Sequence, residues 1–332
     1  FGLSEHIKID APPYGPDFLS TAKLVIAFND FNFDFREALE YRNRLGLPSV
    51  CAIEGIGDFL RLDYAKYRFL PYRRCDYVFL AGEDDQRFFE DRKTYITGLP
   101  IIEKLARKTP HFPKKPLAIL NVNFTYGVLE GARAQFIKSA QHAFEAAGFD
   151  YAITKHPAER SDLSGLPVST KSQYDLIDEG SVFVSRFATG ILEALASGKP
   201  AIYFNPHGEK VEKFKSPMGA FQCANNAAEL SAALEKTMKE ITDGVDFRER
   251  AAAFLRRHTG YAPGEDSTSG RFADAVDDII EKTCAHNHRM LQMFYDRLEE
   301  QTEPRRNQVF GEFKENNGAY LDESGMLCAI TS

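Results

Sequence analysis

The chain has 332 residues, of which 43% are hydrophobic and 27% are charged. This length and composition are typical of a globular protein with two domains. The net charge of −7 disfavours nucleic acid as a partner, because a phosphate backbone requires a basic surface. No apolar run in the sequence approaches the ~20 residues that a membrane-spanning helix needs.

The five cysteines are widely scattered and form no CxxC pair. This spacing predicts reduced thiols in a cytoplasmic protein. One cluster, Cys284 to His288, has metal-ligand residue types, but positions i, i+2 and i+4 of a helix do not share one face, so no metal site is predicted. The chain begins Phe1-Gly2 rather than with methionine, which predicts a fragment whose first domain is truncated.

In the first half, short apolar runs alternate with a helical pattern, as in a parallel α/β sheet. A helix is predicted from Asp34 to just before Gly46. The predicted strands are Leu24–Phe28, Ser49–Ile53, Tyr77–Ala81 and Tyr95–Thr97. Residues 104–116 are basic, contain proline and lack periodicity, so they are predicted to link a first domain, residues 1–103, to a second.

The second half begins a new alternation of strands and helices. The predicted strands are Leu117–Asn121, Tyr151–Thr154, Val182–Val184 and Ala201–Phe204. The predicted helices are 131–147, 174–178, 191–196, 227–240 and 247–257. Residues 117–265 are therefore the predicted second domain, and residues 266–332 a C-terminal helical extension. The predicted fold class is α/β, with two Rossmann-like domains built on parallel sheets; a single doubly wound domain is the alternative.

Ligands of open α/β sheets bind at the carboxyl ends of the strands. In the first half, these ends present carboxylates: Asp30 follows the first strand and Glu54 follows the second. Because Gly55 permits close approach of a substrate, Glu54 is the predicted catalytic base and Asp30 a second candidate. A turn or helix-capping carboxylate is the alternative for Glu54.

The strand ends of the second half present a different chemistry. One predicted helix begins beside Ser185, Arg186 and Thr189, where free backbone N–H groups and a guanidinium favour a phosphate. Glu193 follows one to two turns later, within reach of a ribose diol. The two halves thus predict a cleft with a base on one wall and an anion site on the other.

Two histidines follow other strands of the second half. His156 precedes Pro157, which favours an extended backbone and directs the imidazole out of the strand end. His207 follows the strand Ala201–Phe204. Both are predicted to lie at the nucleotide cleft, with a structural histidine as the alternative.

With these residues identified, the second half resembles the nucleotide-binding domain of GT-B glycosyltransferases. The segment Thr189–Pro200, TGILEALASGKP, is similar to an EA…GKP helix whose glutamate binds the nucleotide ribose. The resemblance implies that Glu193 binds the ribose and that Ser185, Arg186 and Thr189 bind the phosphate. The family's retaining GT4 members carry a second glutamate where this chain has Ser185.

Two further motifs narrow the resemblance to bacterial capsule and lipopolysaccharide enzymes. Lys155-His156-Pro157 resembles the His-Pro motif of sialyltransferases and related enzymes, which contacts the CMP part of the donor. Ile53-Glu54-Gly55 is similar to the acidic-Gly motif whose carboxylate is their catalytic base. Polymerases that use CDP-glycerol share this layout but usually carry His-Gly at the position of Glu54-Gly55.

The resemblance implies a glycosyltransferase that moves a CMP-activated acidic sugar, such as Kdo or sialic acid, onto a surface polysaccharide. The implied partners are the nucleotide-sugar donor and an oligosaccharide or glycolipid acceptor, with no metal or other cofactor. Peripheral association with the inner membrane or with other assembly enzymes is also implied. The alternatives are a UDP-sugar transferase, a UDP-GlcNAc 2-epimerase-like enzyme, a CDP-glycerol phosphotransferase and a catalytically silent scaffold.

Overall fold

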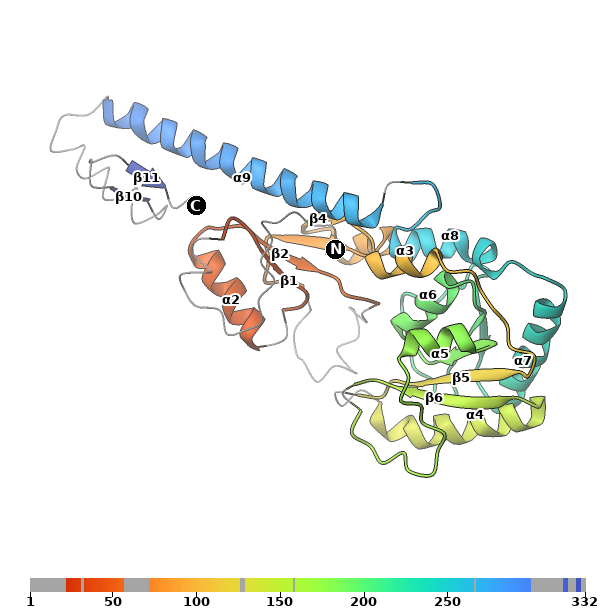
Figure 1. Ribbon diagram of the computed structural model, residues 1–332. Helices are drawn as coiled ribbons and strands as arrows, with labels where there is room; N and C mark the ends of the chain where they lie inside the picture. The colour runs from red at the N-terminus through yellow and green to blue at the C-terminus, as the bar shows by residue number, and fades with distance from the viewer. Residues whose placement is uncertain are drawn as a thin grey trace.

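The structure is a computed structural model. It describes residues 22–30, 33–56, 72–125, 129–157, 159–265, 267–299, 319–321 and 327–329. Figure 1 shows two lobes, each built around a sheet, and a long helix that returns across the first of them. The first lobe contains strands β1–β4 and the second contains strands β5–β9.

The first lobe has a four-stranded sheet in the order β1-β2-β3-β4, with all neighbours parallel. The strands are β1 (Val25–Ala27), β2 (Ser49–Ala52), β3 (Tyr77–Leu80) and β4 (Lys93–Ile96). Helix α2 (Phe33–Arg44) follows β1, and the short 3-10 helix η1 (Glu83–Phe88) follows β3. Helix α3 (Pro100–Ala106), which begins with proline at its first turn, leads towards the second lobe.

The second lobe has a five-stranded parallel sheet in the order β6-β5-β7-β8-β9. Its strands are β5 (Leu117–Val122), β6 (Asp150–Lys155), β7 (Val182–Ser185), β8 (Ala201–Phe204) and β9 (Gln222–Ala224). Its helical elements are η2 (Glu130–Ala132), α4 (Arg133–Ala147), α5 (Gln173–Glu179), α6 (Thr189–Ala196), α7 (Ala227–Thr242) and α8 (Phe247–Thr259).

Helices cover both faces of the second sheet. On one face, α4 and α7 pack Phe136 and Leu234 against strand residues such as Val184. On the other face, α5, α6 and α8 pack against Phe183 and its neighbours. This second cluster continues into the first lobe, where it includes Leu80, so the two lobes share one hydrophobic core.

Helix α9 (Thr268–Glu299) leaves the second lobe and packs on the first (Figure 1). Its apolar residues Phe272, Val276 and Ile279 lie against Val50 and Phe79 of β2 and β3. Phe272 and Phe79 form an edge-to-face pair with centroids 5.0 Å apart. The first half of α9 therefore covers one face of the first sheet.

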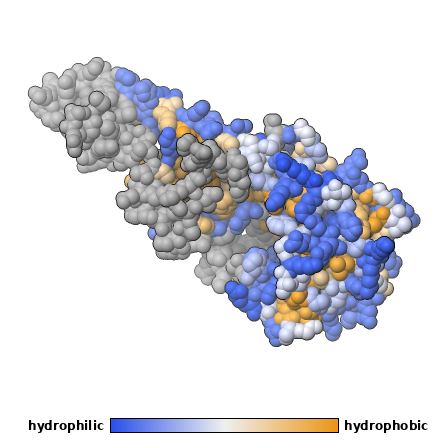
Figure 2. All heavy atoms as spheres, viewed as in Figure 1, coloured by the Kyte–Doolittle hydropathy of each residue, from blue (hydrophilic) through white to orange (hydrophobic). Residues whose placement is uncertain are grey.

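The predicted α/β class with two parallel sheets is confirmed, since every predicted strand and helix of the two lobes forms. The predictions did not include α3, the edge strand β9, or the hairpin of β10 (Ala319–Leu321) and β11 (Leu327–Ala329). The hairpin lies in the segment that the sequence predicted to be helical. Figure 2 shows mostly hydrophilic residues on the visible face of the second lobe, with hydrophobic patches between them.

Candidate active site at the junction of the two sheets

The carboxyl edges of the two sheets meet at the loop that follows β2. The backbone N–H of Ile56 in this loop donates a hydrogen bond to Oγ1 of Thr189, the first residue of α6, at 2.8 Å. A side chain on Gly55 would come within 2.4 Å of the same oxygen, so only glycine allows this approach without movement. The structure therefore brings together predicted site residues from both halves of the chain.

Glu54 precedes this contact and is exposed, although its neighbour Ile53 is buried. Partial desolvation raises the pKa of the Glu54 carboxyl above its ordinary value. Burial raises the pKa of the Tyr72 hydroxyl as well, with the nearby charge of Glu54 adding to the effect. An accessible carboxylate with increased basicity is suited to accept a proton from a hydroxyl group.

Asp30, the second predicted carboxylate, is in a different situation. It is completely buried, and its two oxygens accept hydrogen bonds from the backbone N–H groups of Tyr72 and Arg73 at 2.7 Å and of Arg74 at 3.1 Å. These bonds fasten the residues that lead into β3. The structure thus gives Asp30 an anchoring role and no open face towards a substrate.

Helix α6 begins without a side-chain cap, because the preceding Ala188 is extended and offers no acceptor. Gly198, in the left-handed conformation, terminates the helix region. At the other end, the uncapped first turn and the helix dipole provide an environment that favours an anion. Thr189 is half-buried at this turn, where its hydroxyl reaches the other lobe.

Glu193 lies on the next turn of α6 and is 6% exposed. Its carboxylate accepts a hydrogen bond from Gln173 Nε2 at 2.5 Å and from the Tyr174 hydroxyl at 3.2 Å. Burial raises the pKa of Glu193, while these two donors act in the opposite direction. The amide of Asn121, at the end of β5, in turn donates to Gln173 Oε1 at 2.5 Å, which extends the network across the sheet edge.

Ser185 closes β7 and is fully buried. It is in register with Asn121 on β5, so both side chains lie on the face covered by α5 and α6. Within the described residues, the Ser185 hydroxyl and Oδ1 of Asn121 are buried without a hydrogen-bond partner. The floor of the α6 site is therefore polar and has unused hydrogen-bonding capacity.

Arg186 is bound to another part of the protein. Its guanidinium donates to Oε2 of the buried Glu209 through Nε at 2.9 Å and Nη2 at 2.6 Å, and to the carbonyl of Asn123 at 2.8 Å. Glu209 also accepts from the backbone N–H of Phe187 at 2.9 Å. Burial raises the pKa of Glu209, but His207, the Arg186 guanidinium and the Phe187 N–H together lower it below its ordinary value. A carboxylate of the protein thus neutralises the predicted phosphate-binding arginine.

His207 belongs to the same cluster. Its imidazole is 3% exposed, packs edge-on against Phe124 and Phe136, and has Nε2 3.5 Å from Glu209 Oε2. This buried aromatic packing is that of a structural histidine. The structure groups Arg186, His207 and Glu209 together, whereas Thr189 and Glu193 form the neighbouring part of the edge.

His156 and Pro157 follow β6, the outer strand of the sheet, as the sequence predicted. His156 is half-buried and Pro157 is exposed. Desolvation lowers the pKa of His156, against the opposing effect of Glu159. Glu159 is held by Arg133 at 3.1 Å, which links this turn to the start of α4.

Some residues with roles at this edge were not predicted. Gln173 and Tyr174 donate hydrogen bonds to Glu193. The sequence indicated only that they lie at the start of a short helix, not that they contact the site. Glu209 lies in a polar segment without a motif. Lys199 of the GKP motif is buried and donates to the carbonyls of Asp178 and Gly180 at 2.8 Å and to that of His111, so it has a structural role.

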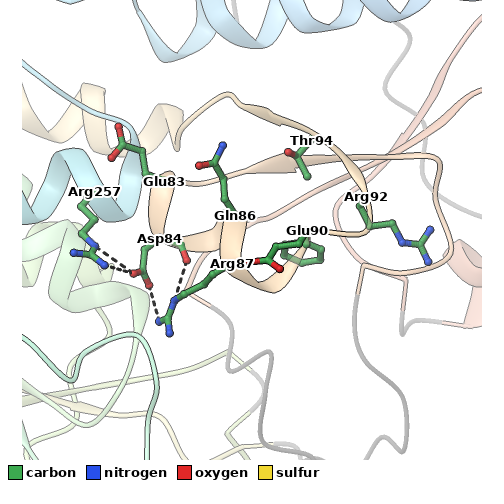
Figure 3. A pocket seen from close by; sticks show the side chains of 9 residues that line it. Glu83, Asp84, Gln86, Arg87, Glu90, Arg92, Thr94 and Arg257 are labelled. Carbon is green, nitrogen blue, oxygen red and sulfur yellow. Dashed lines mark hydrogen bonds and ion pairs between the residues drawn. The ribbon is translucent and has the colours of Figure 1, made fainter.

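A cavity with a volume of about 590 Å³ lies elsewhere among the described residues, beside η1. Figure 3 shows Arg87 and Arg257 pointing towards Asp84 in this cavity. Both guanidiniums donate a hydrogen bond to this carboxylate at 3.0 Å, so their positive charges are paired within the protein. None of the predicted site residues lines this cavity, and we do not assign the active site to it.

Within the described ranges, no group of three His, Cys, Asp or Glu side chains could hold a metal ion. In the same part of the chain, no helix is both long and apolar enough to span a membrane.

Comparison with families of protein sequences and with curated proteins finds no match. Comparison with solved structures finds many. A protein of Listeria monocytogenes assigned as a UDP-N-acetylglucosamine 2-epimerase aligns with a TM-score of 0.51 and 12% identity, over 78% of this chain and 73% of that one. MnaA of S. aureus, solved with UDP, gives the same score and identity, over 78% and 74%. The chain has the GT-B fold. At this identity, the likeness concerns the GT-B fold and leaves the reaction to be argued from the site.

Proposed function

We propose that this GT-B protein is a glycosyltransferase that moves a sugar from a pyrimidine nucleotide to an oligosaccharide or glycolipid acceptor of a bacterial surface polysaccharide. The observation that carries the proposal is the contact between the Glu54 loop and the start of α6. It joins a candidate base to a candidate anion site, which are the two elements that a group transfer from a nucleotide donor requires.

In the proposed reaction, the Glu54 carboxylate takes the proton of an acceptor hydroxyl. The acceptor oxygen then bonds to the anomeric carbon of the donor sugar, and the bond from that carbon to the phosphate oxygen breaks. The nucleotide leaves with the bond's electron pair, and its negative charge is stabilised by the first turn of α6 and the Thr189 hydroxyl. If configuration is retained, Glu54 instead attacks the sugar itself.

We further propose CMP-activated Kdo or sialic acid as the donor, with Glu193 binding the ribose and His156-Pro157 contacting the nucleotide. The resemblance of these motifs to CMP-dependent enzymes supports this donor. The second candidate is a UDP-sugar, used by a transferase or a 2-epimerase, which is favoured by the likeness to MnaA solved with UDP. Ser185, with its unused hydroxyl, lies at the floor of the same site.

We propose that the protein works in the cytoplasm, at the inner face of the membrane or beside other assembly enzymes. The free thiols of Cys51, Cys75, Cys223 and Cys284 support a reducing compartment. The function is proposed to require no metal, because helix N–H groups and hydroxyls can carry the charge of the leaving phosphate.

The test is a thermal-shift titration of the whole chain with CMP, CDP, UDP and GDP, followed by assays for nucleotide release from CMP-sialic acid, CMP-Kdo and UDP-GlcNAc. A nucleotide at 100 times its Kd stabilises the native state by about 2.7 kcal/mol. We expect CMP to give the largest shift, and Glu193→Ala to reduce it, while the exposed Glu235→Ala on α7 leaves it unchanged. If UDP gives the largest shift, the donor proposal is replaced by its rival; if no nucleotide shifts the melting temperature, the scaffold alternative is correct.

A further inference from the structure

The Thr189 hydroxyl occupies a position between the two functional parts of the proposed site. Its oxygen lies 2.8 Å from the backbone nitrogen of Ile56, a residue 133 positions away in the sequence. Ile56 is two residues after Glu54, so this hydrogen bond fixes the loop that carries the candidate base. The close approach of Gly55 to the same oxygen places the loop directly against α6.

A threonine hydroxyl has one hydrogen to donate and two lone pairs with which to accept. The Ile56 N–H uses one lone pair, so the hydroxyl can still donate its hydrogen. Thr189 is the first residue of α6, at the uncapped turn where the helix dipole favours an anion. The same oxygen can therefore accept from the base loop and donate to a phosphate oxygen of the donor.

Hydrogen bonds arranged in such a chain strengthen one another, because donation by the hydroxyl makes its oxygen a better acceptor. A phosphate at α6 should thus tighten the bond from Ile56. By thermodynamic reciprocity, a docked loop should also bind the donor more tightly, and by the same factor.

We propose that Thr189 is a positioning residue that couples occupation of the donor site to the placement of Glu54. This inference rests on the proposed function and adds the order of events. The base loop is held in its working position most firmly when a nucleotide is bound, so the base is aligned when there is a sugar to transfer. Misplacement of a catalytic group by about 1 Å can cost roughly 100-fold in rate.

Two substitutions separate the two sides of the hydroxyl. Gly55→Ala forces the Thr189 side chain to rotate or the loop to move, which breaks the bond from Ile56 but leaves the Thr189 hydroxyl available to a phosphate. Gly55 lies outside the left-handed backbone region, so alanine is compatible with its conformation. Thr189→Val preserves the shape of the side chain but removes its hydroxyl, whereas Thr189→Ser keeps the hydroxyl and removes only the methyl group. Gly131→Ala is the matched control, because a side chain there meets nothing within 4 Å.

The first readout is hydrogen exchange at the Ile56 amide, measured with and without CMP and UDP. We expect the better-binding nucleotide to slow exchange about 5-fold or more in the wild-type protein. In Thr189→Val and Gly55→Ala, exchange should be fast and indifferent to the nucleotide. The second readout is turnover, and Gly55→Ala should lower kcat about 10- to 100-fold. The same substitution should weaken nucleotide binding by no more than the factor by which the nucleotide slows Ile56 amide exchange in the wild-type protein. Gly131→Ala should remain within about 3-fold of wild type in both readouts, and Thr189→Ser, which keeps the hydroxyl, should recover most of what Thr189→Val loses.

The outcomes distinguish this inference from the function on which it rests. If no nucleotide binds the wild-type protein, the proposed function is wrong and the coupling with it. If a nucleotide binds but leaves Ile56 exchange unchanged, or if Gly55→Ala retains full kcat, the coupling alone is overturned. Equal losses in Gly131→Ala and Gly55→Ala would also overturn it, since the effect would then come from substituting glycine.

Discussion

Asp30 and Glu54 follow neighbouring parallel strands of the first sheet, yet their carboxylates are in opposite situations. Three backbone N–H groups bind Asp30, which is 0% exposed. Glu54 is accessible and has a raised pKa. The difference shows that position at a sheet edge does not by itself make a carboxylate available for chemistry.

The second sheet repeats the contrast with different side chains. Arg186 and Thr189 both lie between β7 and the first turn of α6, but Arg186 binds the buried Glu209, whereas Thr189 reaches the loop of the other lobe. A charge that is already paired inside the protein has little left to offer a ligand. At each sheet edge, one predicted side chain is bound within its own lobe (Asp30 or Arg186). The other lies at the junction of the lobes (Glu54 or Thr189).

The largest expected effect comes from the available carboxylate. Glu54→Gln keeps the size of the side chain but cannot accept a proton, so we expect kcat to fall roughly 10²–10⁴-fold. Nucleotide affinity and stability should be unchanged, because Glu54 is exposed. Steady-state transfer assays combined with a nucleotide titration measure both. Glu37→Gln, on the exposed side of α2, is the control, and a fully active Glu54→Gln would remove Glu54 from the mechanism.

The pH dependence of the same reaction sharpens this prediction. A base works only when ionised, so activity should fall as the pH is lowered through the pKa of Glu54. Desolvation raises that pKa above the ordinary value of 4.5, and the acidic limb of kcat/KM should shift upward accordingly. Glu54→Asp should retain an acidic limb, and the residual activity of Glu54→Gln should lack it.

The next effect concerns stability and tests the paired side of the comparison. Glu209→Ala leaves the Arg186 guanidinium and the Phe187 N–H buried without their acceptor, which should lower the free energy of unfolding by about 3–5 kcal/mol. The measurement is a urea denaturation midpoint. Glu179→Ala breaks the exposed pair with Lys171, with N and O 2.6 Å apart, and should cost only about 0–1 kcal/mol. Similar losses in the two variants would show that the buried Arg186–Glu209 pair contributes no more to stability than an exposed ion pair.

Most of the fold was predictable from the sequence because strands and helices depend on local patterns. Short apolar runs such as Val182–Val184 and terminators such as Gly198 indicate their elements directly. The short edge strand β9 was not, since its three residues alternate too briefly to give a pattern. The folding of α9 onto the first sheet also depends on tertiary packing, which periodicity does not encode.

The candidate site was predictable in its location but not in its bonding. Parallel strands bring their carboxyl ends to one edge, so the sequence indicated where Glu54 and Thr189 would lie. It did not indicate that Arg186 would be neutralised by Glu209, 23 residues away and in no motif. The acceptors and donors that decide availability come from distant segments and often from the backbone, as at Asp30.

The smallest effect is expected at Tyr174, which contacts Glu193 rather than the junction itself. Its hydroxyl donates to Glu193 Oε1 at 3.2 Å, while Gln173 holds the other oxygen. Tyr174→Phe removes one neutral donor, worth about 0.5–1.5 kcal/mol, so nucleotide affinity should fall by roughly 2- to 10-fold with kcat unchanged. Tyr151→Phe is the control, because the Tyr151 hydroxyl accepts a hydrogen bond from Gln141 at 2.8 Å and lies at the start of β6, away from the carboxyl ends of the strands. A loss above about 100-fold would mean that Tyr174 binds the nucleotide directly, and no loss would mean that Gln173 alone is sufficient to orient Glu193.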